Sequence, residues 1–506
     1  MSTVTEVNQN LKALTEAGVS VWLDQLGRSL IAGGELKRLI AQESLRGITS
    51  NPAIFEKSIL GTSDYDETIA QLARQNKSTL EIYDALVIAD VQGAADTLKP
   101  VYDESGGTDG FVSLEVPPNL ALNTEETLAA ARRYWQAVDR PNLMIKIPGT
   151  QQGLPAIEQA IYEGINVNVT LLFATEAYAE VMEAYLKGLE RRHAESKPLK
   201  VSSVASFFVS RVDTAVDKQL SDEQLKGKAA LANAREAYQL FKARFAGPRW
   251  DALAQAGAVV QRPLWASTGV KNPNYKDTLY VDELIAPHTV NTMPLGTLNA
   301  VADHGKVPGS TADQNPKEVL AQLKSAGIDL KAVTDQLLED GIKSFEDAFD
   351  KLLAGIDSQR QAVITGRPPT ISASLPAAFE AAVSNRVKSA VSERVAQRVW
   401  KLDQSLWGGP GVPEIENRLG WLTVTEQMSE HLSDLTQLAG ELKQEGYSDV
   451  LLLGMGGSSL GPEVIRRSLG DQGGLKLHVL DSTHPDTIKA TEDSLNLAKT
   501  IFIVSS

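Results

Sequence analysis

Three charged residues stand near the ends of apolar segments whose composition predicts β-strands. Lys146 lies in LMIKIP and Glu115 in FVSLEV, each two residues before a proline, while Asp24 closes VSVWLD three residues before a glycine. Proline and glycine interrupt strands, so all three side chains should lie at C-terminal strand ends. A buried charge without a partner costs several kcal/mol, and we therefore expect the three to face one another.

These residue types predict covalent chemistry by an amine. An exposed lysine is neutral in roughly one molecule in a few thousand at pH 7, whereas burial lowers an amine pKa towards about 7 or 8. A neutral Lys146 would attack a carbonyl and form a Schiff base, which favours metal-free cleavage of a carbon–carbon bond. Asp24 would take a proton from a sugar hydroxyl, and Glu115, directly or through a water, would move protons for the imine.

Two structural interpretations compete with this chemistry. The three charges could form an ion-pair network that only stabilises the strand ends. Lys146 alone could lie near a strand end and extend its ammonium group into water.

The strands that would position these residues alternate with helical segments from residue 19 to about residue 294. The candidate strands are residues 19–24, 47–50, 111–116, 143–148, 166–173, 201–208, 263–268 and 283–290. Eight strands alternating with helices over this length predict a (β/α)8 TIM barrel, an α/β fold. A doubly wound open sheet is the alternative, because strand number alone does not prove closure.

One face of these strands is polar. In residues 166–173, Asn168 and Thr170 share one face, while Val169 and Leu171 share the other. Helices cover the outside of a barrel, so the polar face must point inward. Packing alone would favour Val, Ile and Leu there, and the polar interior therefore predicts a site.

Two domains are expected in a chain of 506 residues. We predict a barrel over residues 1–364, a linker rich in Pro, Gly and Ser over 365–375, and an α/β module over 376–506. Ser344, with Asp347 three residues on, predicts a helix N-terminus late in the first domain. Apolar residues at every fourth position over 379–399 predict an amphipathic helix at the start of the second.

Composition narrows the function classes. The chain has no cysteine, which excludes disulfides and thiolate metal sites, and its six histidines show no metal-ligand spacing. The formal net charge of −15 argues against nucleic-acid and anionic-membrane partners. The N-terminus has no signal-peptide pattern and no apolar run approaches the roughly 20 residues of a membrane span. We expect a cytoplasmic protein without a metal.

The chain resembles the transaldolase family over about residues 10–364 and is most similar to its longer-chain branch. Seven motifs carry the resemblance in family order: VWLDQLGR, GITSNPAIF, VSLEVPP, LMIKIPGT, INVNVTLLF, VASFFVSR and LWASTGVKNPNY. The resemblance implies a cofactor-free enzyme of the pentose phosphate pathway. It would transfer a dihydroxyacetone unit from sedoheptulose 7-phosphate to glyceraldehyde 3-phosphate, giving erythrose 4-phosphate and fructose 6-phosphate.

The same resemblance assigns roles to individual residues. Lys146 would be the Schiff-base residue, Asp24 the acid–base group on the sugar hydroxyl, and Glu115 the proton shuttle with Thr170 holding a water. Hydroxyls of the dihydroxyacetone unit would be bound by Asn51, Asn168 and Ser206.

A phosphate site would lie near Arg211, at the start of a helix, with a hydroxyl from Ser267. The commonest family pattern has an arginine two residues after that serine, where this chain has Gly269. The second cation is therefore either Lys271 or Arg262.

The second module resembles the beginning of glucose-6-phosphate isomerase, an SIS-like, Rossmann-like α/β module, through DVLLLGMGGSSLGPEVI. Gly457 and Ser458 would approach a sugar there. A dinucleotide site is the alternative, although the glycines do not complete GxGxxG. The chain stops where that family continues into its phosphate loop and catalytic residues, so we expect a shortened module without isomerase activity.

Two other functions remain open for the barrel, both with sugar phosphates as ligands. One is a different Schiff-base aldolase acting on sugar phosphates. The other is a non-catalytic sugar-phosphate-binding module, against which the complete set of Asp24, Glu115 and Lys146 argues.

Overall fold

The computed structural model describes residues 7–365, 377–408, 412, 414–415, 418–470 and 473–505. The chain divides into two compact units, residues 1–371 and 372–506. Apart from its first residue, the predicted linker 365–375 lies outside the described residues. The two units are therefore described one at a time.

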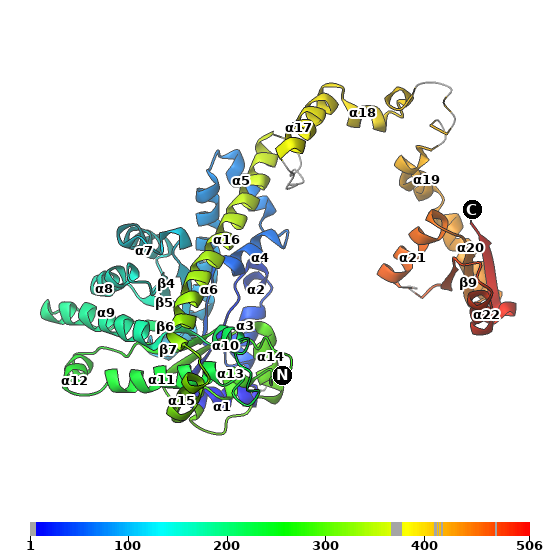
Figure 1. The fold of residues 1–506 in the computed structure, drawn as a ribbon. Coiled ribbons are helices and arrows are strands. Elements are labelled where there is room, and N and C mark those ends of the chain that lie inside the picture. Colours follow the sequence, from blue (N-terminus) through cyan, green and yellow to red (C-terminus); the bar gives the residue numbers. More distant parts are fainter. Residues whose placement is uncertain are drawn as a thin grey trace, which may run out of the picture. The chain divides into compact units, whose positions relative to one another are not determined.

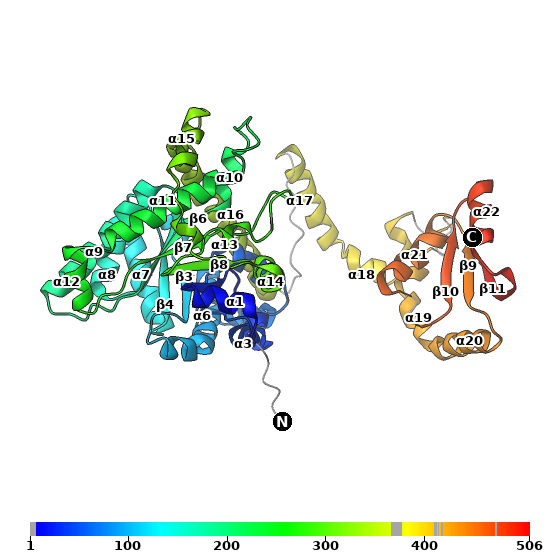
Figure 2. The ribbon, with the colours of Figure 1, turned by 90° about the horizontal axis from the view of Figure 1, so that it is seen from below.

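The first unit is a closed barrel of eight parallel strands in sequence order, with β1 hydrogen-bonded to both β2 and β8. Its strands are β1 Val19–Leu23, β2 Gly47–Ile48, β3 Phe111–Glu115, β4 Leu143–Pro148, β5 Val167–Leu172, β6 Ser203–Phe208, β7 Arg262–Ala266 and β8 Thr289–Met293. The predicted barrel is confirmed and the open-sheet alternative is wrong. Helices surround the strands (Figures 1 and 2).

The eighth strand lies later than predicted. Residues 283–290 were expected to form it, whereas β8 begins at Thr289. Pro287 cannot donate to a strand ladder, which excludes the earlier segment from the sheet. The segment is apolar for another reason. Leu284, Ile285 and Ala286 are buried in the connection between α13 and β8, outside the sheet.

The barrel helices follow the strands in the expected alternation. They are α1 Gln9–Glu16, α2 Arg28–Ala32, α3 Glu35–Gln42, α4 Pro52–Leu60, α5 Asp66–Arg74, α6 Thr79–Glu104, α7 Thr124–Val138, α8 Gly153–Glu163, α9 Thr175–Ala194, α10 Ser210–Val216, α11 Ala229–Arg244, α12 Pro248–Gln255, α13 Leu279–Asp282, α14 Leu295–His304, α15 Lys317–Ser325 and α16 Leu330–Thr365.

Helix α16 departs from the repeat. It packs against α4, α5, α6, α10 and β5, so a single long helix lies over several βα units (Figure 1). The helix start predicted at Ser344 is wrong, because Ser344 lies inside α16. The helix begins instead after Asp329, whose Oδ1 accepts a hydrogen bond of 3.1 Å from the Ala332 amide.

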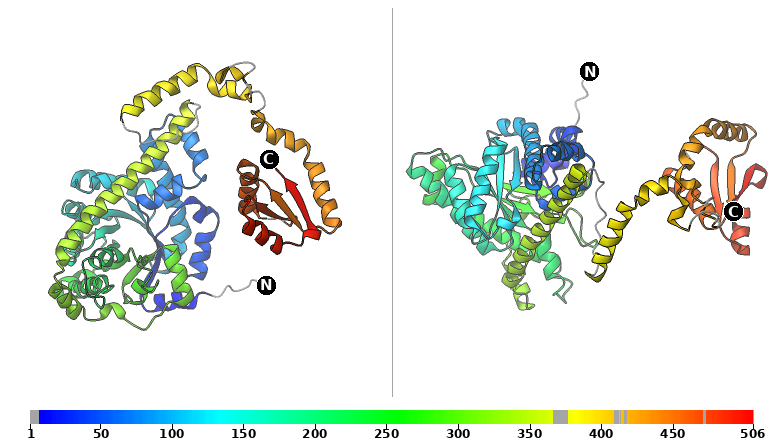
Figure 3. Two further views of the ribbon diagram at one scale, coloured as in Figure 1. Left: turned by 45° about the vertical axis from the view of Figure 1, so that its right-hand side comes forward. Right: turned by 90° about the horizontal axis from the view of Figure 1, so that it is seen from above.

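The second unit contains a three-stranded parallel sheet in the order β10-β9-β11 (Figures 2 and 3). Its elements are α17 Ala377–Ser392, α18 Val395–Trp400, α19 Val424–Glu430, α20 Leu432–Gln444, β9 Asp449–Leu453, α21 Gly457–Leu469, β10 Lys476–Leu480, α22 Pro485–Ser494 and β11 Thr500–Val504. The amphipathic helix predicted over 379–399 is interrupted at Arg394, where φ is 52°. No helix within the described ranges is both long and apolar enough to cross a bilayer.

The N-terminal end of the barrel is filled by a tryptophan and closed by a polar network. Trp22 is fully buried, and its Nε1 donates to Asp109 Oδ1 at 2.9 Å. Arg262 donates to Ser20 Oγ at 2.6 Å and pairs with Asp109 at 3.5 Å. A Cβ on Gly47 would lie 2.4 Å from the Trp22 ring, so only glycine fits beside it.

We expect Gly47→Ala to lower the free energy of unfolding by about 1–3 kcal/mol, because the added methyl must displace the packed indole. Gly296→Ala is the matched control. Gly296 lies in α14, and no atom lies within 4 Å of the place that its Cβ would take, so alanine should stabilise the helix by about 0.5–1 kcal/mol. Urea denaturation of the two variants measures both effects, and equal stabilities would contradict the packing argument.

Candidate active site

Sheet register places three polar side chains side by side inside the barrel. Lys146 on β4 is paired with Glu115 on β3 and with Asn168 on β5. Paired residues of neighbouring strands point to the same face of a sheet. Glu115 ends β3, and Lys146 lies in the last half of β4, so the group sits at the C-terminal end of the barrel.

Lys146 is held inside the protein. Its side chain is 5% exposed, and its Nζ lies 3.2 Å from Glu115 Oε2. The same nitrogen donates to the Ser50 carbonyl oxygen at 3.1 Å. The interpretation in which this amine extends into water is therefore wrong.

Glu115 is suited to exchange protons near neutral pH. Burial raises the pKa of its carboxyl to about 7, while the positive charge of Lys146 acts in the opposite direction. A carboxyl that titrates near pH 7 and contacts an amine can accept or donate a proton with little cost.

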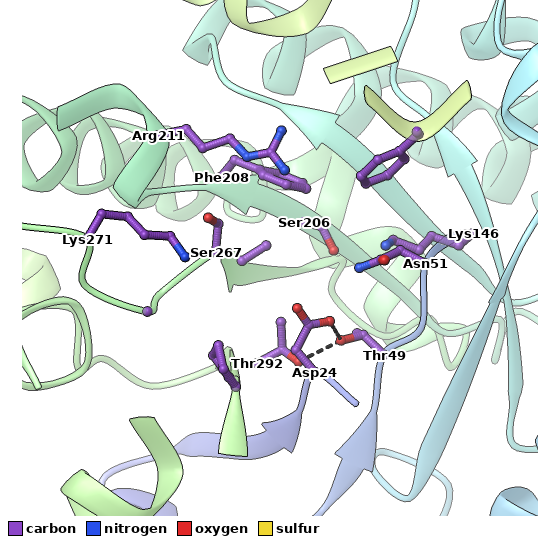
Figure 4. A pocket seen from close by; sticks show the side chains of 14 residues that line it. Asp24, Thr49, Asn51, Lys146, Ser206, Phe208, Arg211, Ser267, Lys271 and Thr292 are labelled. Carbon is purple, nitrogen blue, oxygen red and sulfur yellow. Dashed lines mark hydrogen bonds between the residues drawn. The ribbon is translucent and has the colours of Figure 1, made fainter. Parts of the chain in front are cut away.

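Asp24 follows β1 directly and faces the same cavity. Burial raises the pKa of the Asp24 carboxyl, against the charges of Lys146 and Arg211. Its Oδ1 accepts a hydrogen bond of 2.6 Å from Thr49 Oγ1, which lies 2.7 Å from Thr292 Oγ1 (Figure 4). These threonines hold the carboxylate in one orientation.

A chain of amide and hydroxyl groups continues from Lys146 along the barrel wall. Ser206 Oγ donates to Asn168 Oδ1 at 2.7 Å, and Asn168 Nδ2 donates to Ser113 Oγ at 2.9 Å. Asn51 is the N-cap of α4, where its Oδ1 accepts from the Ile54 amide at 2.9 Å. The two asparagines are thus fixed by the protein before any ligand binds.

Strand β5 carries an irregularity next to this group. Its register shifts between Val169 and Leu172, and Leu171 has a φ of 59°. The alternation that placed Leu171 on the outer face is therefore broken. Leu171 instead meets α16, since a Cβ on Gly341 would lie 3.0 Å from its Cδ2. Thr170 Oγ1 is buried and has no hydrogen-bond partner among the described side chains.

The cavity itself has a volume of about 190 Å³ and two chemically distinct ends. Lys146 and Asn51 lie at one end, and Arg211, Ser267 and Lys271 lie at the other, with Ser206 between them (Figure 4). A molecule that spans this cavity therefore meets an amine at one end and two cations at the other.

Arg262 does not contribute to the cationic end. It is the first residue of β7, and its guanidinium binds Ser20 and Asp109 at the N-terminal end of the barrel. Of the two candidates for the second cation, Lys271 lines the cavity.

Several residues that line the cavity were not predicted, among them Thr49, Thr292 and Phe345, which contact Asp24, Thr49 or Lys146. Thr49 lies in the GITSNPAIF motif, two residues before Asn51, where its polar character was a usable signal. Thr292 was missed because the eighth strand was placed too early. Phe345 lines the cavity from α16, and its ring centroid is 5.8 Å from Lys146 Nζ. Sequence periodicity marked it only as part of an apolar helix face.

The remaining predicted residues lie elsewhere. Gly457 and Ser458 open α21 in the second unit, after Gly456, whose φ is 64°. Within the described part of the chain, no three His, Asp or Glu side chains gather to hold a metal ion.

Comparison with known proteins identifies relatives of the barrel. A family model described as transaldolase/fructose-6-phosphate aldolase matches residues 21–356. Transaldolase 1 of Streptomyces avermitilis is 52% identical over 366 residues, covering 70% of this chain and 97% of that protein. The transaldolase of Thermobifida fusca is 50% identical, covering 69% of this chain and 98% of its own length. The transaldolase of Trichodesmium erythraeum is 46% identical, covering 70% of this chain and 98% of its own length. This chain belongs to the transaldolase/fructose-6-phosphate aldolase family.

Proposed function

We propose that the barrel is a transaldolase that moves a dihydroxyacetone unit from sedoheptulose 7-phosphate to glyceraldehyde 3-phosphate. The observation that carries the proposal is the buried Lys146 amine, 3.2 Å from a carboxyl and at one end of a polar cavity. The relatives at about 50% identity are named transaldolases, which supports the same activity here.

The first step is formation of the imine. The neutral Lys146 amine adds to the C2 carbonyl of the ketose, and the resulting hydroxyl leaves as water when a C=N bond forms. Glu115 takes the ammonium proton and returns a proton to the departing oxygen. The free hydroxyl of Thr170 is suited to hold the water through which these protons pass.

Carbon–carbon cleavage follows. The Asp24 carboxylate removes the proton of the C4 hydroxyl, the C3–C4 bond breaks, and its electron pair moves into the protonated imine. An aldose phosphate leaves, and an enamine of dihydroxyacetone remains on Lys146. In the second half-reaction C3 of the enamine attacks the acceptor aldehyde, and Asp24 returns its proton to the new hydroxyl. Water then adds to C2 of the new imine, the C2–N bond breaks, and the ketose leaves the Lys146 amine.

Other polar residues would orient the sugar. Asn51 and Ser206, which line the cavity, and Asn168, which accepts a hydrogen bond from Ser206, would bind hydroxyls of the dihydroxyacetone unit. Arg211 and Lys271 supply positive charge for the phosphate, with the Ser267 hydroxyl between them (Figure 4). Local cations are needed because the chain as a whole carries a net charge of −15.

For residues 376–506 we propose kinship with the N-terminal part of glucose-6-phosphate isomerase, with Gly457 and Ser458 near a sugar. The order of strand β9, glycine-rich turn and helix α21 supports this proposal. Gly456 at a φ of 64° allows the sharp turn that leads into the helix.

Borohydride reduction in the presence of fructose 6-phosphate should trap a dihydroxyacetone-derived adduct on Lys146, located by mass spectrometry of the peptide. Lys146→Met should give no adduct and lower turnover by at least about a thousandfold, because the nucleophile is gone. Circular dichroism should show an unchanged fold. An adduct on another residue, or more than a few per cent of activity in the variant, would falsify the mechanism. Products formed with and without acceptor aldehyde distinguish transfer from simple aldolase release.

The rate should depend on the ionisation of Glu115. Burial raises the pKa of this carboxyl to about 7, so its proton-accepting form becomes dominant only as the pH rises through that value. We expect kcat/KM to increase with pH and to level off above about pH 7. Glu115→Gln should lower the rate and remove this limb of the profile. A variant that keeps the limb would assign the titration to another group.

The cationic end should govern recognition of the phosphate. We expect Arg211→Ala and Lys271→Ala to raise KM for fructose 6-phosphate by about 10- to 100-fold, since each removes a charge-assisted contact. Turnover of unphosphorylated fructose should change little. Lys218→Ala is the matched control, because Lys218 is an exposed lysine outside the cavity lining. A similar rise in KM for Lys218→Ala would mean that net charge, not contact, sets the affinity.

A further inference from the structure

An aromatic ring from outside the barrel repeat lies over the amine. Phe345 belongs to α16, is 4% exposed and lines the cavity. The centroid of its ring is 5.8 Å from Lys146 Nζ. The helix that carries it packs against β5 and four barrel helices, so the ring is held in place by a large contact area.

Other aromatic residues near the site have different surroundings. Phe208 lies at the cationic end, where its ring centroid is 5.2 Å from the Arg211 guanidinium carbon. Phe349, one turn further along α16, packs edge-on against Tyr83 at a centroid distance of 5.2 Å and does not line the cavity. Phe345 is therefore the described aromatic residue placed against the reacting nitrogen.

The ring has two physical effects at this position. A protonated imine is a cation, and an aromatic face within about 6 Å of a cation stabilises it by roughly 0.5–2 kcal/mol. The same ring is part of the cavity wall beside Lys146, so it takes up space next to the reacting nitrogen that water would otherwise fill.

Water matters because the enzyme-bound enamine has two fates. In transfer, C3 forms a bond with the acceptor aldehyde carbon. In release, C3 takes a proton to give the protonated imine, and water then adds to C2. The C2–N bond breaks, its electron pair stays on the Lys146 nitrogen, and free dihydroxyacetone leaves. Release therefore consumes a water molecule at C2 before an acceptor has reacted. In transfer, water is needed at C2 only after the new carbon–carbon bond has formed, when the ketose imine is hydrolysed and the product leaves.

We propose that Phe345 sets the partition between transfer and release, by excluding water from the imine on Lys146 until the acceptor aldehyde has reacted. Phe345 is thus a specificity-determining residue that acts on the bound intermediate, and the inference rests on the transaldolase function proposed above. The proposal gives the Phe345 ring a role at the site, whereas the apolar periodicity of the helix explains this residue only by packing.

The test measures a ratio of products. Fructose 6-phosphate and erythrose 4-phosphate are supplied to the full-length protein, and free dihydroxyacetone and sedoheptulose 7-phosphate are quantified together. Phe345→Ala should raise the ratio of dihydroxyacetone to sedoheptulose 7-phosphate by about tenfold, the equivalent of about 1.4 kcal/mol. A loss of folded protein lowers both products alike and leaves the ratio unchanged, so instability alone cannot produce this result.

Two further variants serve as controls. Phe345→Leu keeps apolar volume without the aromatic face and should raise the ratio less than alanine does. Phe349→Ala removes a ring of the same helix with similar burial, 5% exposed against 4%, and should leave the ratio unchanged.

An unchanged ratio in Phe345→Ala, or an equal rise in Phe349→Ala, would overturn the inference while the adduct on Lys146 still stands. Failure of the wild-type protein to form that adduct would instead overturn the proposed function, and this inference with it.

Discussion

The pairing of Lys146 with Glu115 inside the barrel is the constraint on which the site depends. Removing two charges from water costs several kcal/mol per ion unless they neutralise each other at close range. Sheet register enforces that range, since the two residues are paired across β3 and β4. Because burial brings the pKa of Glu115 to about 7, the pair can exchange a proton at neutral pH without charge separation over a distance.

The rest of the cavity follows from the position of this pair. In the proposed reaction the pair marks the reacting end, which puts the phosphate at the far end, where Arg211 and Lys271 are found (Figure 4). Asp24 lies between the two cationic regions, and both Lys146 and Arg211 oppose the effect of burial on its pKa. The Thr49 hydroxyl, which is itself hydrogen-bonded to Thr292, then fixes the orientation of this carboxylate. In the proposed mechanism, covalent attachment, proton transfer and phosphate recognition thus take separate places in one cavity.

Sequence predicted the parts of this site that depend on strand alternation and strand ends. Glu115 and Lys146 each stand two residues before a proline, which ends a strand. Both were therefore placed at C-terminal strand ends, where they could face each other. Arg262 stands just before its predicted strand, so it belongs at the N-terminal end of the barrel, opposite to Lys146. Position relative to the strand would therefore have excluded Arg262 and left Lys271 as the second cation of the phosphate site. The bulge at Leu171 escaped prediction because alternation assumes a regular strand. Thr292 was lost with the misplaced eighth strand.

Phe345 illustrates a limit of a different kind. The spacing of apolar residues identifies which face of α16 is buried. It does not identify what that face packs against, because those residues belong to strands much earlier in the chain. Yet this helix contributes the ring of Phe345 to the cavity wall beside Lys146. All residues that line the cavity lie between Asp24 and Phe345, within the first unit and within the span matched by the family model. The barrel therefore contains every side chain that the proposed chemistry uses, and α16 belongs to the catalytic unit because its ring completes the surroundings of the amine.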